Sequence, residues 1–283
     1  MRDGILSIQS AVAYGHVGNS AAIFPLQRLG LEAWPVNTVL FSNHTGYGAW
    51  RGRAVGLDWV EEIVAGIAER GVLPHVQAVL SGYLGEPGLG EVVLRTVAEV
   101  RARRPDMVYA CDPVMGDEGR GFFVKSGIPE LFRRQVVPAA DIVTPNQFEL
   151  AYLAAMNIAT VADALAAAAK VRATGPRIVV CTSLMTGDAR ELAVLADSAE
   201  SSWIVHTPHL PVTLNGTGDV FTALFLANWL RTGDLAATLE QAVAAMYGLV
   251  EATHRAGARE LELIAAQDEL VAPTRRFEAR RLR

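Results

Sequence analysis

The feature that most constrains the fold of this chain is its alternation of short apolar segments with longer amphipathic ones. Short apolar runs predict strands, at residues 5–9, 33–40, 77–80, 107–111, 141–144 and 177–181. Apolar residues at helical spacing predict helices, at residues 19–29, 57–70, 90–103, 149–156, 161–174, 218–230 and 236–253. Strands that alternate with helices favour an α/β fold with a mostly parallel sheet and helices on both faces.

Two further strand-like segments, 192–195 and 203–206, are expected to form a hairpin that adds antiparallel strands. No linker, fixed-period repeat or low-complexity tract divides the chain, so we expect one domain over residues 1–283. Sheets of this kind bind ligands beyond the carboxyl ends of their strands. We therefore expect the functional site among the residues that directly follow the strands.

Composition excludes several classes of function. The chain has 25 Lys+Arg and 30 Asp+Glu, a formal net charge of −5, which argues against a general nucleic-acid binder. Lys125 and Lys170 are the only lysines, and neither follows a glycine, so the chain has no P-loop. Catalysis through a lysine Schiff base would also be confined to these two residues.

The sequence also indicates a cytoplasmic protein without a membrane partner. It has no apolar run of about 18 residues, as a membrane span requires, and its first residues lack the apolar stretch of a signal peptide. Cys111 and Cys181 lie in apolar, strand-like segments, so we expect buried thiols and no disulfide.

The clearest chemical motif is Asn215-Gly216-Thr217-Gly218-Asp219, at the start of the helix predicted at 218–230. Closely spaced glycines allow a ligand to approach the backbone, and the N–H groups at a helix start attract anions. An aspartate beside such an anion can accept a proton from a hydroxyl that attacks phosphorus. The alternative is a plain helix cap, which Gly, Thr and Asp also suit.

Carboxylates near the ends of two predicted strands favour the catalytic interpretation. Asp112 follows the strand at 107–111, and Glu149 lies three residues after Asn146, on the first turn of a helix. Carboxylates beside an anion site suit a hydrated Mg²⁺ that bridges to nucleotide phosphates. The alternative for Asp112-Pro113 is a simple turn at the exit of the strand.

The order and spacing of these motifs resemble the ribokinase-like superfamily of small-molecule kinases. The motifs are Asp112-Pro113-Val114-Met115-Gly116, Asn146-x-x-Glu149 and Gly216-Thr217-Gly218-Asp219. The N-terminal half narrows the resemblance to the pyridoxal kinases, through Ile8-Gln9-Ser10, residues 14–22 and 41–47, and Ser81-Gly82-Tyr83-Leu84-Gly85. The resemblance extends over nearly the whole chain.

The resemblance implies a three-layer α/β/α sandwich without a separate lid domain, and a homodimer. It implies an ATP-dependent kinase that phosphorylates the 5′-hydroxymethyl group of pyridoxal. Asp219 is implied as the base, and the anion hole as Gly216, Thr217 and Gly218. The implied pyridoxal contacts are Ser10, Thr45, Gly46, Tyr83 and Asp219. The implied ATP contacts are Asp112, Thr144, Asn146, Glu149, Thr182, Ser183, Thr207, Pro208, His209 and Leu210. Mg²⁺ is implied at Asp112 and Glu149, with the use of K⁺ left open.

Two positions depart from the family pattern. Many members carry Gln where this chain has Gly46, so one substrate contact is changed. Bacterial members often carry Lys where this chain has Thr182, and a hydroxyl offers a hydrogen bond without a positive charge. Mg²⁺ and helix dipoles would then neutralise more of the phosphate charge.

Two other functions stay open: a hydroxymethylpyrimidine kinase or other small-molecule kinase of the same fold, and a non-catalytic carrier of B6 vitamers.

The loop 115–125 is expected to close over the phosphates. The basic tail 275–283 is expected to fold back through Phe277 and Leu282.

Overall fold

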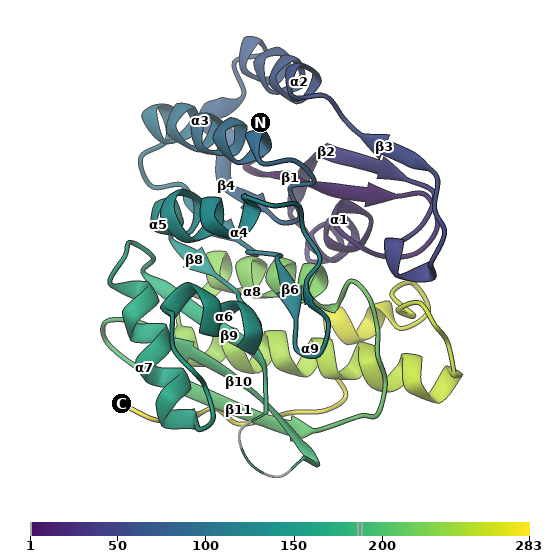
Figure 1. Cartoon of the computed structure of the whole chain (residues 1–283), viewed down its shortest axis with the longest axis vertical. Coiled ribbons are helices and arrows are strands. Elements are labelled where there is room, and N and C mark those ends of the chain that lie inside the picture. The colour runs from purple at the N-terminus through teal and green to yellow at the C-terminus, as the bar shows by residue number, and fades with distance from the viewer. Residues whose placement is uncertain (1, 186, 188) are drawn as a thin grey trace.

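The computed structural model describes residues 2–185, 187 and 189–283. Its centre is a run of parallel strands in the order β9-β8-β5-β4-β1-β2, within a ten-stranded sheet (Figure 1). These strands are β1 (Gly4–Val12), β2 (Glu32–Phe41), β4 (Val76–Ser81), β5 (Val108–Cys111), β8 (Ile142–Val143) and β9 (Ile178–Leu184). The predicted mostly parallel sheet is therefore confirmed, and its carboxyl ends meet along one edge.

Antiparallel strands extend both sides of this parallel core. On one side lie β10 (Glu191–Asp197), β11 (Ser202–Pro208) and β12 (Arg280–Arg281), and on the other lies β3 (Gly52–Ala54). The predicted hairpin is confirmed as β10 and β11. The pattern missed β3 and β12 because they are too short to show an alternation. A separate small hairpin pairs β6 (Gly116–Asp117) with β7 (Gly121–Phe122).

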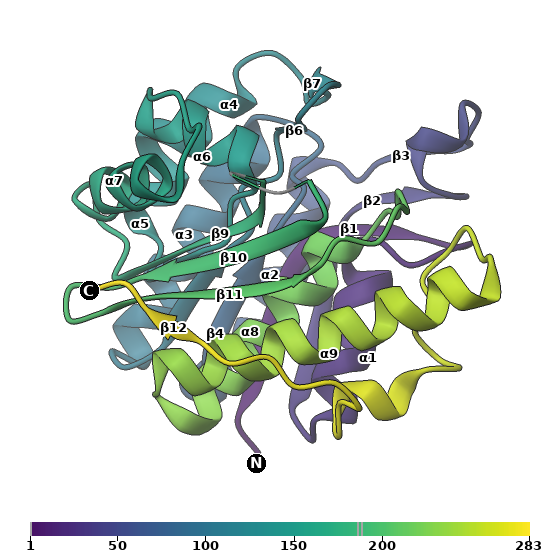
Figure 2. The ribbon, with the colours of Figure 1, turned by 90° about the horizontal axis from the view of Figure 1, so that it is seen from below.

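Helices cover both faces of the sheet, so the predicted three-layer sandwich is confirmed. One core cluster packs α2 (Leu57–Glu69), α3 (Gly88–Arg103), α4 (Ile128–Leu131), α5 (Val137–Ala139), α6 (Gln147–Ala154) and α7 (Val161–Arg172). The opposite cluster packs α1 (Asn19–Arg28), α8 (Thr217–Thr232) and α9 (Leu235–Ala256). Figure 2 shows α8 and α9 on one face and α6 and α7 on the other.

Short helical turns complete the described elements. They are η1 (Thr45–Tyr47), η2 (Leu73–His75), η3 (Phe132–Val136) and η4 (Gln267–Leu270). One predicted boundary moves for a clear reason: the helix expected at 149–156 starts at Gln147. The Asn146 side chain caps it by accepting a hydrogen bond from the Glu149 N–H at 2.9 Å.

The basic tail folds back as expected. The Phe277 ring lies edge-on to Tyr247, with centroids 5.0 Å apart, and Leu282 packs against the core. Arg283 donates to the wholly buried carboxylate of Asp197 at 3.0 Å. The end of the chain is therefore held by apolar packing and by an ion pair.

The two thiols are free and buried, as expected. Burial raises the pKa of Cys111 to about 12 and also raises the pKa of Cys181. Among the described helices, none has the length and apolar character that crossing a bilayer would require.

Candidate active site

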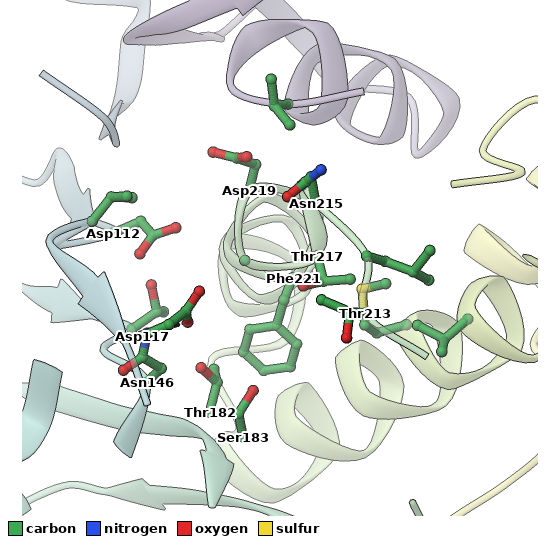
Figure 3. A pocket seen from close by; sticks show the side chains of 18 of the residues that line it. Asp112, Asp117, Asn146, Thr182, Ser183, Thr213, Asn215, Thr217, Asp219 and Phe221 are labelled. Atoms are coloured by element: carbon green, nitrogen blue, oxygen red, sulfur yellow. Dashed lines mark hydrogen bonds between the residues drawn. The ribbon is translucent and has the colours of Figure 1, made fainter. Parts of the chain in front are cut away.

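A cavity of about 680 Å³ opens at the carboxyl ends of the parallel strands, and Figure 3 shows part of its lining. The structure brings every predicted site residue to this one cavity. These are Ser10, Thr45, Gly46, Tyr83, Asp112, Thr144, Asn146, Glu149, Thr182, Ser183, Thr207, Pro208, His209, Leu210, Gly216, Thr217, Gly218 and Asp219. They converge because consecutive parallel strands all end at the same edge of the sheet.

The start of α8 forms one wall of the cavity. Gly216 caps the helix in a left-handed conformation, at φ 81°. A Cβ atom at this position would lie 1.8 Å from the backbone oxygen of His16, so only glycine fits. The N–H groups of this first turn face the cavity without a side-chain cap, which is the arrangement that binds anions.

Asp219 lies on the same helical turn, and its carboxylate borders the space that Asp112 also borders (Figure 3). Withdrawal from water raises the pKa of Asp219 to about 6, and a hydrogen bond from the Gly18 backbone partly offsets this rise. A carboxylate with this pKa is ionised at neutral pH and is still basic enough to accept a proton.

Asp112 and Glu149 form a buried acidic pair, with exposures of 5% and 3%. Glu149 accepts hydrogen bonds from the backbone of Met115 at 2.7 Å and of Asn146 at 3.0 Å. Burial nevertheless raises the pKa of Glu149 to about 8. Burial, and then the charges of Glu149 and Asp219, raise the pKa of Asp112 well above its ordinary range.

This pair fits a hydrated Mg²⁺. The charges of neighbouring acids raise the pKa of Asp112, so a cation beside the pair would relieve this repulsion, and carboxylates are ligands that Mg²⁺ prefers. Within the described part of the chain, no group of three or more His, Cys, Asp or Glu side chains could hold a metal ion. The residues present therefore suit an ion that keeps waters and shares phosphate oxygens.

Thr144 and Thr182, two of the predicted ATP contacts, occupy different places in the cavity lining. The Thr144 hydroxyl bonds to the Thr222 hydroxyl of α8 at 2.7 Å, and Thr222 bonds to the Gly218 carbonyl at 2.9 Å. Thr144 thus holds the anion-binding turn in place. Thr182 lies in β9 and forms an isolated bridge with Asn146, and Ser183 beside it has a positive φ of 54°, a strained conformation common at functional sites.

Several lining residues were missed from the sequence. The apolar side chains Val243, Met246, Tyr247 and Val250 line the cavity from α9, whose contribution cannot be read from helical periodicity alone. His44, Asp117, Glu118 and Arg120 add charged and polar groups from two loops. Asp117 and Arg120 lie inside the loop 115–125, which was expected to close over phosphates. Their position in this loop could have predicted that they line the site.

The loop around Thr45 is fixed by its own contacts. The Gly46 N–H donates to His44 Nδ1 at 3.1 Å. A Cβ at Gly46 would lie 2.9 Å from that nitrogen, so a larger residue requires the ring to move. Tyr83, after β4, is partly buried beside the cavity, and burial raises its pKa.

Glu260 ties this loop to the segment after β1. Its carboxylate accepts hydrogen bonds from the Tyr47 hydroxyl and, at 3.0 Å, from the His16 N–H. Gly15 (φ 94°) lets it approach, because a Cβ there would lie 2.4 Å from the carboxylate oxygen. Arg259 stacks on Tyr47, with its guanidinium carbon 4.3 Å from the ring centroid.

Comparisons with known proteins agree with this geometry. A family model described as phosphomethylpyrimidine kinase matches residues 21–263. The chain is 56% identical over 281 residues to a pyridoxal kinase, PdxY, of Rubrobacter xylanophilus, covering 98% of this chain and 97% of the relative. It is 51% identical to the pyridoxal kinase PdxY of Leifsonia xyli, covering 98% and 99%. A solved structure, the pyridoxal kinase of Leishmania donovani in complex with ADP and pyridoxine, has a TM-score of 0.93 at 32% identity, covering 99% of each chain.

Proposed function

The chain belongs to the pyridoxal kinase family, and we propose that it transfers the γ-phosphoryl group of ATP to the 5′-hydroxymethyl group of pyridoxal or a related B6 vitamer. The observation that carries this proposal is the position of Asp219. Its carboxylate lies on the first turn of α8, beside uncapped N–H groups and opposite Asp112. A base next to an anion site, across from an acidic metal site, suits phosphoryl transfer to a hydroxyl.

In the proposed reaction, the oxygen of the 5′-hydroxyl attacks the γ-phosphorus, and Asp219 accepts the proton of that hydroxyl. The bond from phosphorus to the β,γ-bridging oxygen breaks, and ADP leaves. The N–H groups of Gly216, Thr217 and Gly218 stabilise the charge on the transferring group. The rest of the rate enhancement comes from holding the two substrates in line.

Asp112 and Glu149 are proposed to hold Mg²⁺, which neutralises phosphate charge when bound. Both oxygens of Glu149 already accept backbone N–H groups, so it is suited to contact a water of the ion. No group among the described residues donates a hydrogen bond to the Asp112 carboxylate, so its oxygens are available to bind the ion. Whether K⁺ is also required is tested by adding it to the assay with Mg²⁺ described below.

The two substrates are proposed to lie side by side in the cavity. Pyridoxal is placed among Ser10, Thr45, Gly46 and Tyr83, where Tyr83 can stack on its ring. ATP is placed along the remaining predicted contacts, with its base toward the apolar side chains of α9. The apolar lining there suits a flat heteroaromatic base.

One assay tests this function against its alternatives. The protein is incubated with ATP and Mg²⁺, with and without K⁺, and with pyridoxal, pyridoxine, pyridoxamine or hydroxymethylpyrimidine, and products are detected by mass spectrometry. We expect phosphorylated vitamers. The matching family model favours hydroxymethylpyrimidine as the second candidate, and a clear preference for it would replace the proposal. Binding of pyridoxal without any ATP-dependent product would instead identify a carrier.

We further propose a cytoplasmic homodimer in which residues 1–283 form one domain. The continuous ten-stranded sheet, with a core cluster on each face, supports one domain, and the free, buried thiols suit a reducing compartment. Exposed apolar side chains support self-association: Leu40 on β2, Trp50 before β3, and Trp59 and Ile63 one turn apart on α2. Light scattering coupled to size-exclusion chromatography tests the dimer, and a monomer would contradict it.

A further inference from the structure

The charge lining the cavity is unbalanced for a site that binds a polyanion. The carboxylates along it are Asp112, Asp117, Glu118, Glu149 and Asp219. Of the lysines and arginines that the structure describes, Arg120 alone lines it. Thr182, on the nucleotide wall, offers a hydroxyl and no charge. A triphosphate entering this cavity therefore meets one guanidinium and several acids.

Arg120 is presented by an anchored hairpin. Phe122, on β7, packs edge-on against Phe148 and Tyr152 of α6, at centroid distances of 5.1 and 5.0 Å. Asn146 donates to the Gly116 carbonyl at 2.8 Å, which fastens β6 to the start of the same helix. The hairpin that carries Arg120 therefore stays beside the carboxyl ends of β8 and β9.

The guanidinium itself is oriented by two neighbours. It pairs with the carboxylate of Asp117 and lies over the ring of Phe123, 5.6 Å from the centroid. Asp117 in turn accepts a hydrogen bond from the Asn146 side chain at 3.3 Å, and the backbone of Asn146 pairs with that of Thr182 in an isolated parallel β-bridge. A chain of contacts thus connects Arg120 to the wall that contains Thr182.

We propose that Arg120 binds the phosphates of ATP and supplies the positive charge that Thr182 does not. A guanidinium offers several N–H donors in a plane, which suits phosphate oxygens. Its side chain is half exposed, at 52%, and can turn from Asp117 toward a bound phosphate. The inference rests on the proposed function, since it assigns a role in ATP binding at that same site.

The decisive variant is Arg120→Gln, which keeps a polar side chain and removes the charge. We expect the KM for ATP to rise about tenfold, and the affinity for a non-hydrolysable ATP analogue with Mg²⁺, measured by calorimetry, to fall by a similar factor. The KM for pyridoxal should not change. Adding Thr182→Lys to Arg120→Gln should recover a large part of the lost affinity, because it returns a charge to the same wall.

Arg133→Gln is the matched control, because Arg133 lies over Tyr152, the ring against which Phe122 of the hairpin packs, 5.8 Å from its centroid, but does not line the cavity. It should leave both KM values unchanged. The proposal is overturned if Arg120→Gln leaves ATP binding unchanged, if Arg133→Gln weakens it equally, or if a folded double variant shows no recovery. Binding of the analogue is measured without turnover. If the wild type has no kinase activity, the proposed function is refuted, but the role of Arg120 in ATP binding is still tested by calorimetry.

Discussion

The two halves of the cavity are built in different ways. The half proposed to bind phosphate, here called the rigid half, consists of regular elements: the ends of β5, β8 and β9 and the first turn of α8. The half proposed to bind the vitamin, here called the vitamin half, consists of the segment after β1 and the loop around η1, which the carboxylate of Glu260 joins. Regular elements position atoms more tightly than loops do. We therefore expect the chemistry to depend on the rigid half, and recognition of the acceptor to depend on side-chain contacts that a single substitution can remove.

Removing the base from the rigid half should have the largest effect. Asp219→Asn is expected to lower kcat by about 10³-fold, because the attacking hydroxyl loses its proton acceptor, while pyridoxal and ATP still bind. Turnover and binding are measured separately. In the wild type, kcat/KM should rise with pH as Asp219 ionises, reach half of its maximum near pH 6 and level off above that. Asp234→Asn, at the cap of α9, is the control for a lost carboxylate, and a similar fall there would contradict the assignment.

Loosening the vitamin half should give a smaller and selective effect. Glu260→Ala removes both hydrogen bonds that join the two loops, and is expected to raise the KM for pyridoxal about tenfold with the KM for ATP unchanged. Steady-state kinetics, with pyridoxal and ATP varied in turn, will measure the two KM values separately.

Glu251→Ala provides the comparison, since Glu251 is also a partly buried carboxylate but pairs with Arg255 and Arg275 and not with either loop. Equal changes in both KM values after Glu260→Ala would show that the two halves are not independent. Tyr47→Phe, which removes only one of the two bonds, should have an intermediate effect.

The acidic pair makes an opposite prediction for stability and for activity. A carboxyl whose pKa is raised in the folded state binds protons more readily there than in the unfolded chain, so stability falls as pH rises from its unfolded to its folded pKa. For Glu149 this window runs from 4.5 to about 8. Asp112→Asn should lessen the fall and raise the Tm of the ligand-free protein at pH 8 by about 2–4 °C, while raising the Mg²⁺ concentration needed for activity. Thermal melts across pH check the first effect, and a lower Tm at pH 8 would contradict it.

The smallest effect is expected from Thr182→Lys in the wild-type background. A lysine on this wall should lower the KM for ATP by about two- to threefold, because Arg120 already provides charge and the site is open to solvent. Initial rates at varied ATP give the value. An unchanged KM in a folded variant would place Thr182 away from the phosphates.

How much of the site is predictable from the sequence differs between the halves. The residues of the rigid half follow strand ends or open a helix, so motifs such as Asn146-x-x-Glu149 mark them directly. For the vitamin half, Ser10, Thr45 and Tyr83 were assigned through resemblance, because no local pattern marks them as neighbours. Glu260 was missed altogether, since its partner His16 is 244 residues away along the chain.

The sequence alone determined the α/β class, the parallel sheet and the edge at which the site lies. Periodicity and glycine placement are local properties, and parallel strands bring their carboxyl ends together whatever the detailed packing. Only the tertiary structure decided how each group is used. The Thr144 hydroxyl bonds to Thr222, side chains of α9 line the cavity, and Arg120 is the one lysine or arginine among the described residues that lines it. These outcomes depend on which surfaces meet when distant segments pack, and that is set by the whole fold.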